Sequence, residues 1–305
     1  MKALRSLIAW IDTDQNVVKD DHASGLDWMR VVPFIALHFA CLAVLWVGIS
    51  WIAVAACLFS YALRMFAITA FYHRYFAHRA FRASRSVQFV FALIGASATQ
   101  RGPLWWAAHH RIHHKRADRD GDPHSPNDGL LWSHMGWFLG RRHFGTAWEQ
   151  IPDLAKFPEL RWLDRFDVVV PVIYAALFFG LGVLLQRWAP ALETSGAQML
   201  VWGYFISTVV LIHATLTINS LAHRFGTRRF DTRDQSRNNP WLALLTLGEG
   251  WHNNHHAYPG SARQGFYWWE IDISYALLRV LAAFGVVRDL KSVPEGLLEA
   301  RRVRN

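Results

Sequence analysis

The apolar stretch Val31–Ala70 constrains this chain more than any other feature, because Arg64 is its only Lys, Arg, Asp or Glu residue. A membrane-spanning helix needs about 20 apolar residues, so the stretch is too long for one span and suits two. A Gly-Ile-Ser segment at residues 48–50 supplies a tight turn in its middle. The sequence therefore predicts a membrane protein whose first two spans cover residues 31–48 and 51–70.

Two further apolar stretches, residues 168–186 and 199–218, are long enough to cross a bilayer. Val87–Ala96 is too short to cross and predicts a buried or interfacial helix. Phe266–Val287 is apolar but interrupted by charges, which favours an amphipathic helix on the cap or at the interface. The predicted fold class is an all-α polytopic membrane protein, with four transmembrane helices and a helical cap in a single domain over residues 1–305.

The distribution of basic residues predicts which side of the membrane the cap occupies. Lys and Arg are frequent between the second and third spans, whereas the outer connections offer only Arg187. Because basic loops stay in the cytoplasm, segments 71–165 and 219–305 are predicted to form a cytoplasmic cap, with both termini on the same side. The first 30 residues lack the pattern of a secretory signal.

The net charge of +9 raises nucleic acid as a partner. The basic residues flank apolar spans, however, so the lipid bilayer is the expected partner and nucleic acid is not. The two cysteines, Cys41 and Cys57, lie inside the first apolar stretch and are predicted to be small buried hydrophobic residues without a disulfide.

Nine of the 16 histidines form clusters that the predicted topology places on one side of the membrane. Two clusters repeat the spacing i, i+3, i+4, which puts three imidazoles on one face of a helix. Neutral imidazole is a ligand for iron, zinc, copper and nickel. The clustered histidines are His73, His78, His110, His113, His114, His223, His252, His255 and His256.

Nine imidazoles exceed the needs of one ion, since a tetrahedral zinc takes about four ligands. Two metals with four to five ligands each would use the whole set. Asn219 lies one helical turn before His223 and could reach the same site, directly or through water. The clusters contain no acidic general base of the His-Glu-x-x-His type, which makes zinc hydrolysis the weaker interpretation. The pattern favours a di-iron centre that activates oxygen.

The remaining histidines are predicted to have other roles. His109 and His124 flank the second cluster and are candidate partners for the ligand rings. His38 and His213 lie within spans and are expected to form hydrogen bonds between helices. The others are predicted to be ordinary loop or surface residues: His22, His134 and His143.

The three main histidine clusters resemble the histidine boxes of the integral-membrane fatty acid desaturases. The resemblance is closest to the stearoyl-CoA (Δ9) desaturase branch and covers most of the chain. Supporting segments are Asp122-Pro123-His124, Asn219–His223 and Gly248–Trp251. The boxes read His73-x4-His78, His110-x2-His113-His114 and His252-x2-His255-His256.

This resemblance implies an O2-dependent enzyme that places a cis double bond, at Δ9, in a long saturated acyl chain. It implies a di-iron cofactor held by the boxes, by His223 outside them and by Asn219 through water. The cofactor supplies the oxidant, as is usual for such chemistry. The chain has no His-Pro-Gly-Gly segment, no Gly-x-Gly-x-x-Gly loop and no ferredoxin-type cysteine set. Electrons are therefore expected from a separate protein, a ferredoxin or a cytochrome b5 with its reductase.

One departure leaves the acyl carrier open. Where animal acyl-CoA members have an Arg-Asp pair that contacts CoA, this chain has Ala108 and His109. An acyl-CoA, an acyl-lipid and an acyl-carrier protein are all compatible with the sequence. A membrane di-iron hydroxylase or monooxygenase is an alternative enzyme. A metal transporter is a more remote alternative, because transport needs ligands along a path through the bilayer.

Overall fold

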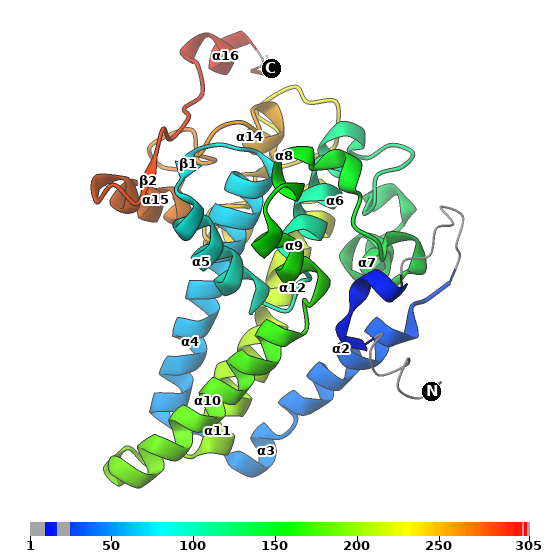
Figure 1. Ribbon diagram of the computed structural model, residues 1–305. Helices are drawn as coiled ribbons and strands as arrows, with labels where there is room; N and C mark the ends of the chain where they lie inside the picture. Colours follow the sequence, from blue (N-terminus) through cyan, green and yellow to red (C-terminus); the bar gives the residue numbers. More distant parts are fainter. Residues whose placement is uncertain (1–9, 17–24, 301, 304–305) are drawn as a thin grey trace.

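The computed structural model describes residues 10–16, 25–300 and 302–303. Within this part of the chain, four helical segments are long and apolar enough to cross a membrane. The four predicted spans are thus confirmed as helices. They form a stem below an irregular body of short helices (Figure 1). The segments are Trp28–Val47, Trp51–Ala77, Val169–Trp188 and Gly196–His223.

The first and third spans are simple. The first consists of α2 (Trp28–Cys41), a turn, and the short α3 (Val44–Val47). Asp27 begins α2 by accepting a hydrogen bond from the Met29 backbone N–H, which satisfies one of the free donors of the first turn. The third is α10 (Val169–Trp188), which packs along α11 (Gly196–Leu200).

The second and fourth spans continue well beyond the ends predicted at residues 70 and 218. In the second, α4 (Trp51–Phe66) passes directly into the π-helical segment η2 (Ala67–Ala77). In the fourth, α11 is followed by a π-helical segment, η8 (Val201–Ile206), by α12 (Ser207–Ser220) and by the 3-10 turn η9 (Leu221–His223). These segments have 27 and 28 residues, against the roughly 20 needed to cross a bilayer. Their ends therefore project into the cap.

The cap comprises residues 78–168 and 224–300, and most of its elements are short. Its one sheet in the described chain is a two-stranded antiparallel pair, in which Arg82 is opposite Arg288. The all-α prediction missed this pair because two-residue strands leave no readable alternation. The strands are β1 (Arg82–Ala83) and β2 (Val287–Arg288). The α-helices are α5 (Arg85–Ala96), α6 (Pro103–Arg116), α7 (Trp137–Leu139), α8 (Pro152–Ala155), α9 (Pro158–Arg165), α13 (Pro240–Leu245), α14 (His252–Ala257), α15 (Ile273–Ala283) and α16 (Glu295–Ala300).

The short helices predicted outside the spans are present, with one different boundary. The segment Val87–Ala96 lies in α5, which packs on η2 and α9. The predicted helix Phe266–Val287 is confined to Ile273–Ala283, because the Asp272 side chain caps it by accepting from the Tyr275 N–H.

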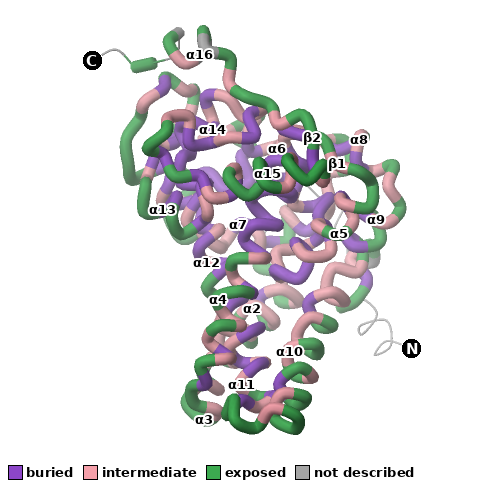
Figure 2. The backbone as a smooth tube through the Cα atoms, turned by 90° about the vertical axis from the view of Figure 1, so that its left-hand side faces the viewer, coloured by how far each residue is buried: buried purple, intermediate pink, exposed green. Residues whose placement is uncertain are grey.

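The stem and the cap differ in how far their residues are buried. Exposed and intermediate residues predominate along the lower stem in Figure 2, whereas buried residues concentrate in the upper body. Large apolar side chains of the stem face outward, as in Trp46 and Trp51, which are 80% and 83% exposed. That pattern suits a surface in contact with lipid. All residues of η2 are buried, and the ring of Phe71 stacks on that of Phe91 at 3.8 Å between centroids.

The polar residues inside the spans behave partly as predicted. The Nε2 atoms of His38 and His213 lie 2.9 Å apart, which confirms a hydrogen bond between helices. His134 extends this contact, since its ring hydrogen-bonds to His213 at 2.9 Å and to Ser220 at 3.0 Å. The prediction that His134 is an ordinary surface residue was wrong. Cys41 and Cys57 are free thiols, as predicted, but they are half-buried and not buried.

Candidate metal centre

All nine clustered imidazoles meet where the second and fourth long helices enter the cap. The end of the second helix supplies His73 and His78, and η9 supplies His223. The other six come from α6 and from α14, two cap helices that are far apart in the sequence. The set is thus assembled from four separate segments, as the clustering in the sequence predicted.

The π-helical segment η2 explains how the side chains of His73 and His78 come to face the same site. Residues five apart differ by about 140° around an α-helix and would point to different sides. In a π-helix the backbone hydrogen bond joins residues i and i+5, so such residues are nearly one turn apart. The His78 N–H donates to the His73 carbonyl at 3.2 Å, and the two rings lie 4.9 Å apart. The wider turn therefore directs both imidazoles into one site.

The nine imidazoles fall into two groups, and the candidate ligand atoms within each lie within 4.8 Å of one another. We call them the five-imidazole group and the four-imidazole group. In the first, Nε2 of His255 lies 3.0 Å from that of His73 and 2.9 Å from that of His114. The five-imidazole group contains His73, His78, His110, His114 and His255, and the four-imidazole group contains His113, His223, His252 and His256.

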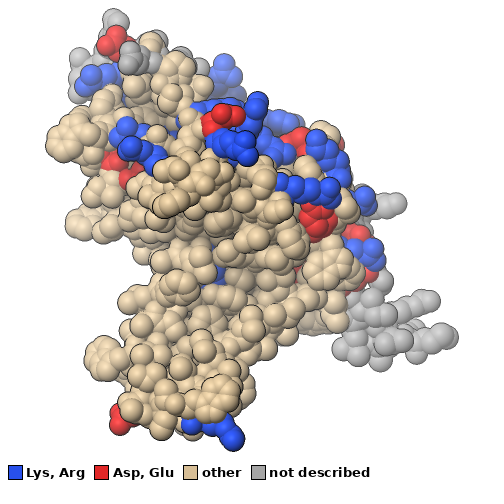
Figure 3. Space-filling model, turned by 60° about the vertical axis from the view of Figure 1, so that its left-hand side comes forward, with Lys and Arg blue, Asp and Glu red and all other residues tan. Residues whose placement is uncertain are grey.

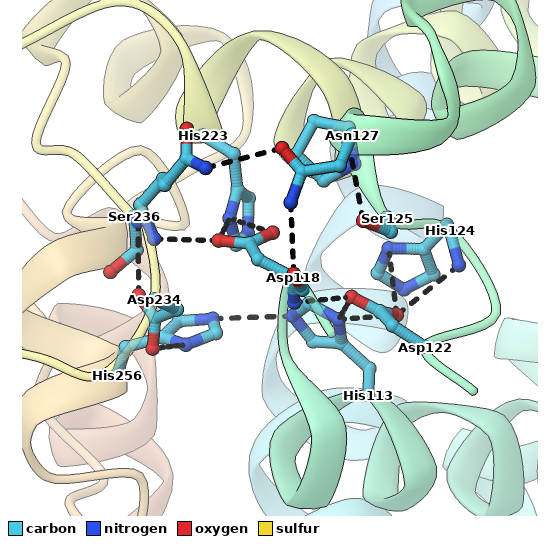
Figure 4. A network of polar contacts seen from close by, with 12 residues as sticks. His113, Asp118, Asp122, His124, Ser125, Asn127, His223, Asp234, Ser236 and His256 are labelled. Atoms are coloured by element: carbon cyan, nitrogen blue, oxygen red, sulfur yellow. Dashed lines mark hydrogen bonds and ion pairs between the residues drawn. The ribbon is translucent and has the colours of Figure 1, made fainter. Parts of the chain in front are cut away.

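Carboxylates hold the outer nitrogens of four of these rings. Asp122 accepts from His113 Nδ1 at 2.9 Å, and Asp234 accepts from His256 Nδ1 at 2.9 Å (Figure 4). His223 Nδ1 lies 3.1 Å from Asp118. In the five-imidazole group only His73 has such a partner, Glu249.

Such contacts fix the orientation and the tautomer of a ligand histidine. Three of the four carboxylates serve the four-imidazole group, so that group carries more negative charge around it.

The buried site keeps most of the ligand rings neutral. Burial lowers the pKa of His78, His110 and His252 well below the usual value, and their neighbouring imidazoles lower it further. Burial also lowers the pKa of His256, to about 4. His113 differs: burial opposes its protonation, but the Asp122 carboxylate outweighs this and raises its pKa. Neutral rings leave a lone pair free for a metal.

The spacing between the rings fits bound cations. His113 and His256 each direct Nδ1 at a carboxylate, so the Nε2 atom of each points inward, and these two atoms lie 3.4 Å apart. A metal ion between them would take the place of any proton on either Nε2 atom. Metal–imidazole bonds of about 2.1 Å would place two nitrogens on one ion about 3.0 to 3.4 Å apart. The donor set therefore suits two metal ions.

A cavity of about 320 Å³ adjoins the groups and extends among α2, α6, α10 and α12. Its walls are mostly apolar and aromatic. Near the imidazoles they include Trp106, whose ring stacks on His110 at 5.0 Å between centroids. Gln100 donates to Thr215 at 3.0 Å across the same cavity. Such a space suits an elongated apolar ligand that extends to the two imidazole groups.

The remaining candidate residues, Asn219 and the histidines outside the nine, differ in their positions relative to the two groups. Asn219 lines the cavity and a smaller one that reaches His113 and His252. His124 stacks on His113 at 4.2 Å, which agrees with a supporting role. His109 instead bonds to the Trp105 carbonyl, and neither it nor His143 belongs to either imidazole group. His22 lies outside the described residues.

Sequence reasoning missed several residues of the site. Asp118 and Asp234 were overlooked because acidic residues are common in polar loops, and only the fold brings them to His223 and His256. The run of Asp residues after the second cluster was the available signal. The cavity also contains two arginines, Arg30 and Arg101, which nothing in the local sequence distinguishes.

Comparisons with known proteins agree with the resemblance found in the sequence. Residues 49–288 match the model of the family described as fatty acid desaturase. The chain is 37% identical to the sn-2 palmitoyl-lipid 9-desaturase of Nostoc, over 70% of this chain and 73% of that protein. It is 38% identical to the probable lipid desaturase ADS3.2 of Arabidopsis thaliana, over 73% of this chain but 59% of that protein. It is 37% identical to the acyl-CoA 5-desaturase AL21 of Anemone leveillei, over 70% of this chain and 63% of that protein.

Proposed function

Because this chain belongs to the fatty acid desaturase family, and is therefore an oxidoreductase acting on acyl chains, we propose that it places a cis double bond at Δ9 of a long saturated acyl group. The proposed reaction uses O2, two irons and electrons from another protein. The observation that carries the proposal is the pair of converging imidazole groups beside an apolar cavity. The Δ9 position rests on the names of the 9-desaturase relatives.

The two imidazole groups would each hold one iron. His73, His78, His110, His114 and His255 would bind one, and His113, His223, His252 and His256 the other. We assign Asn219 to the second iron through a water, since it lines the cavity that reaches His113 and His252. When bound, the irons would supply the oxidant that removes hydrogen from an unactivated methylene.

The protein's own residues orient the histidine rings and the acyl chain. The carboxylates Asp118, Asp122 and Asp234 fix their histidines so that every Nε2 points inward. Trp106 and the Gln100–Thr215 hydrogen bond shape the cavity next to His110. A buried apolar wall excludes water and leaves an acyl chain few ways to lie, which selects the methylene that reacts.

The electron donor is proposed to approach the basic surface of the cap. In Figure 3 Lys and Arg side chains gather on the cap, while the stem below is almost free of charge until its far end. A positive surface of this kind attracts an acidic partner such as a ferredoxin or cytochrome b5. The positive-inside pattern supports a cytoplasmic cap, with both termini and the metal groups on that side.

Expression in a desaturase-deficient host, with a suitable electron donor, tests the function. Gas chromatography of the host's fatty acids should show new cis-monounsaturated chains, with the double bond at carbon 9. Replacing His255 with Ala should abolish them, because its Nε2 lies within 3.0 Å of two other ring nitrogens of its group. The matched control His143→Gln, outside both groups, should retain them.

Two results would contradict the proposal. An unchanged fatty acid profile with inserted wild-type protein and an active donor would refute desaturation. A hydroxylated acyl chain in place of an alkene would instead identify the enzyme as a hydroxylase.

A further inference from the structure

Two buried guanidinium groups line the cavity at Arg30, on the first turn of α2, and at Arg101, just before α6. The wall also includes Trp10, which is 42% exposed, so the cavity reaches the protein surface. The walls elsewhere are mainly apolar. Two cations in such a wall need a reason, because charged groups are costly to bury without partners.

Arg30 is only partly satisfied by the protein. Its side chain is 10% exposed, and its Nη1 donates to the Phe138 carbonyl at 2.8 Å. Its Nε and Nη2 are buried without a hydrogen-bond partner. The nearest carboxylate, Asp27, is 3.9 Å away, and its other oxygen caps α2 by accepting from Met29. Two donors of the guanidinium therefore remain available.

Arg101 contacts the same aromatic ring, that of Phe144. The guanidinium carbons of Arg30 and Arg101 are 3.8 Å and 4.8 Å from the centroid of Phe144. Arg101 donates to the Phe144 carbonyl at 3.1 Å, and its Nε is 3.1 Å from Asp167 without a proper hydrogen bond. Each guanidinium thus has one nearby carboxylate, Asp27 for Arg30 and Asp167 for Arg101, but neither carboxylate hydrogen-bonds to its arginine. Both arginines therefore keep N–H donors without an acceptor.

We propose that Arg30 and Arg101 bind the phosphate of a membrane glycerophospholipid whose acyl chain occupies the cavity. Planar guanidinium groups with free N–H donors suit phosphate oxygens, which they bind through paired hydrogen bonds. The cavity is lined here by the first turns of α2 and α10, where the spans meet the cap. This is the level at which lipid head groups lie.

The position favours a lipid over a nucleotide thioester. In a glycerophospholipid the phosphate is a few bonds from the acyl ester, so both can enter one cavity. In acyl-CoA a long uncharged pantetheine separates the thioester from the phosphates. The inference rests on the proposed function, and it specifies the acyl carrier that the sequence left open.

Lipid binding to the purified full-length protein, followed by native mass spectrometry, tests this directly. Dipalmitoylphosphatidylglycerol should bind at least tenfold more tightly than dipalmitoylglycerol, which has the same chains and no phosphate. Arg30→Gln and Arg101→Gln should each lower this preference severalfold, and Arg30→Lys should lose less than Arg30→Gln. The control Arg161→Gln, at an exposed arginine of α9, should leave the preference unchanged.

Equal binding of the two lipids by the wild-type protein would overturn the inference, as would an unaltered preference in both Gln variants. A wild-type protein that desaturates palmitoyl-CoA but not the phospholipid would also overturn it, while leaving the proposed function intact. Failure to desaturate either substrate would refute the proposed function alone, because the binding measurement requires no turnover.

Discussion

Two of the clustered histidines, His223 and His256, contact carboxylates that the sequence did not single out, Asp118 and Asp234. His256 is buried and holds its inner nitrogen toward His113 only because Asp234 accepts from its outer nitrogen. The nearby Asp231 is exposed and three residues away in the same loop. Substituting each aspartate in turn therefore distinguishes the support of His256 from a general effect of the negative charge of the loop.

Asp234→Asn should weaken metal binding at the four-imidazole group by about 10- to 100-fold, the usual effect of removing such a partner. The isosteric amide keeps the shape of the side chain but removes the negative charge that balances the positive charge of a metal ion. Iron content measured against chelator concentration should show the loss, and Asp231→Asn should titrate like the wild type. Equal retention of iron by both variants would exclude a supporting role for Asp234.

At the scale of elements, the first histidine pair depends on a π-helix that periodicity could not reveal. The apolar pattern predicted the second span correctly but ended it at residue 70, because the sequence becomes polar where the helix leaves the stem. The backbone continues to Ala77 with wider turns, and these bring His73 and His78 together. The gathering of these histidines in one place could be predicted from their spacing, whereas their geometry depends on tertiary packing that overrides local preference.

Two glycines of α10 give a matched test of how the stem packs. A Cβ on Gly182 would lie 2.5 Å from the Ser195 carbonyl oxygen and 2.7 Å from the Gly196 Cα, both backbone atoms of the neighbouring helix start. A Cβ on Gly180 would meet nothing within 4 Å. Gly182 therefore permits close contact between the third and fourth spans.

Gly182→Ala should lower the free energy of unfolding by about 1–3 kcal/mol, because the backbones must separate. Gly180→Ala should be neutral or slightly stabilising, since Ala favours a helix over Gly by about 1 kcal/mol. Thermal unfolding in detergent should rank the variants in this order. If Gly182→Ala unfolds no earlier than Gly180→Ala, the close packing of α10 on α11 is not needed.

At the scale of the whole molecule, a stem of four long apolar helices carries two buried imidazole groups in its cap. Composition and periodicity predicted this division, because long apolar runs and clustered histidines are strong local signals. Two sites with four to five imidazoles each were predicted, but the membership of each group, the extent of the cavity and the Arg30–Arg101 pair could not be predicted. Each arises from residues more than 70 positions apart, which only the folded chain brings together.

The central claim is that nine histidines form one centre for two irons. Metal analysis of the purified protein after expression in iron-rich medium tests it most directly, with Mössbauer spectra to distinguish the two environments. We predict about two irons per chain in unequal sites, and selective loss of the four-imidazole iron in His252→Ala. A fully active protein with a single iron per chain, or with another metal in its place, would contradict the account.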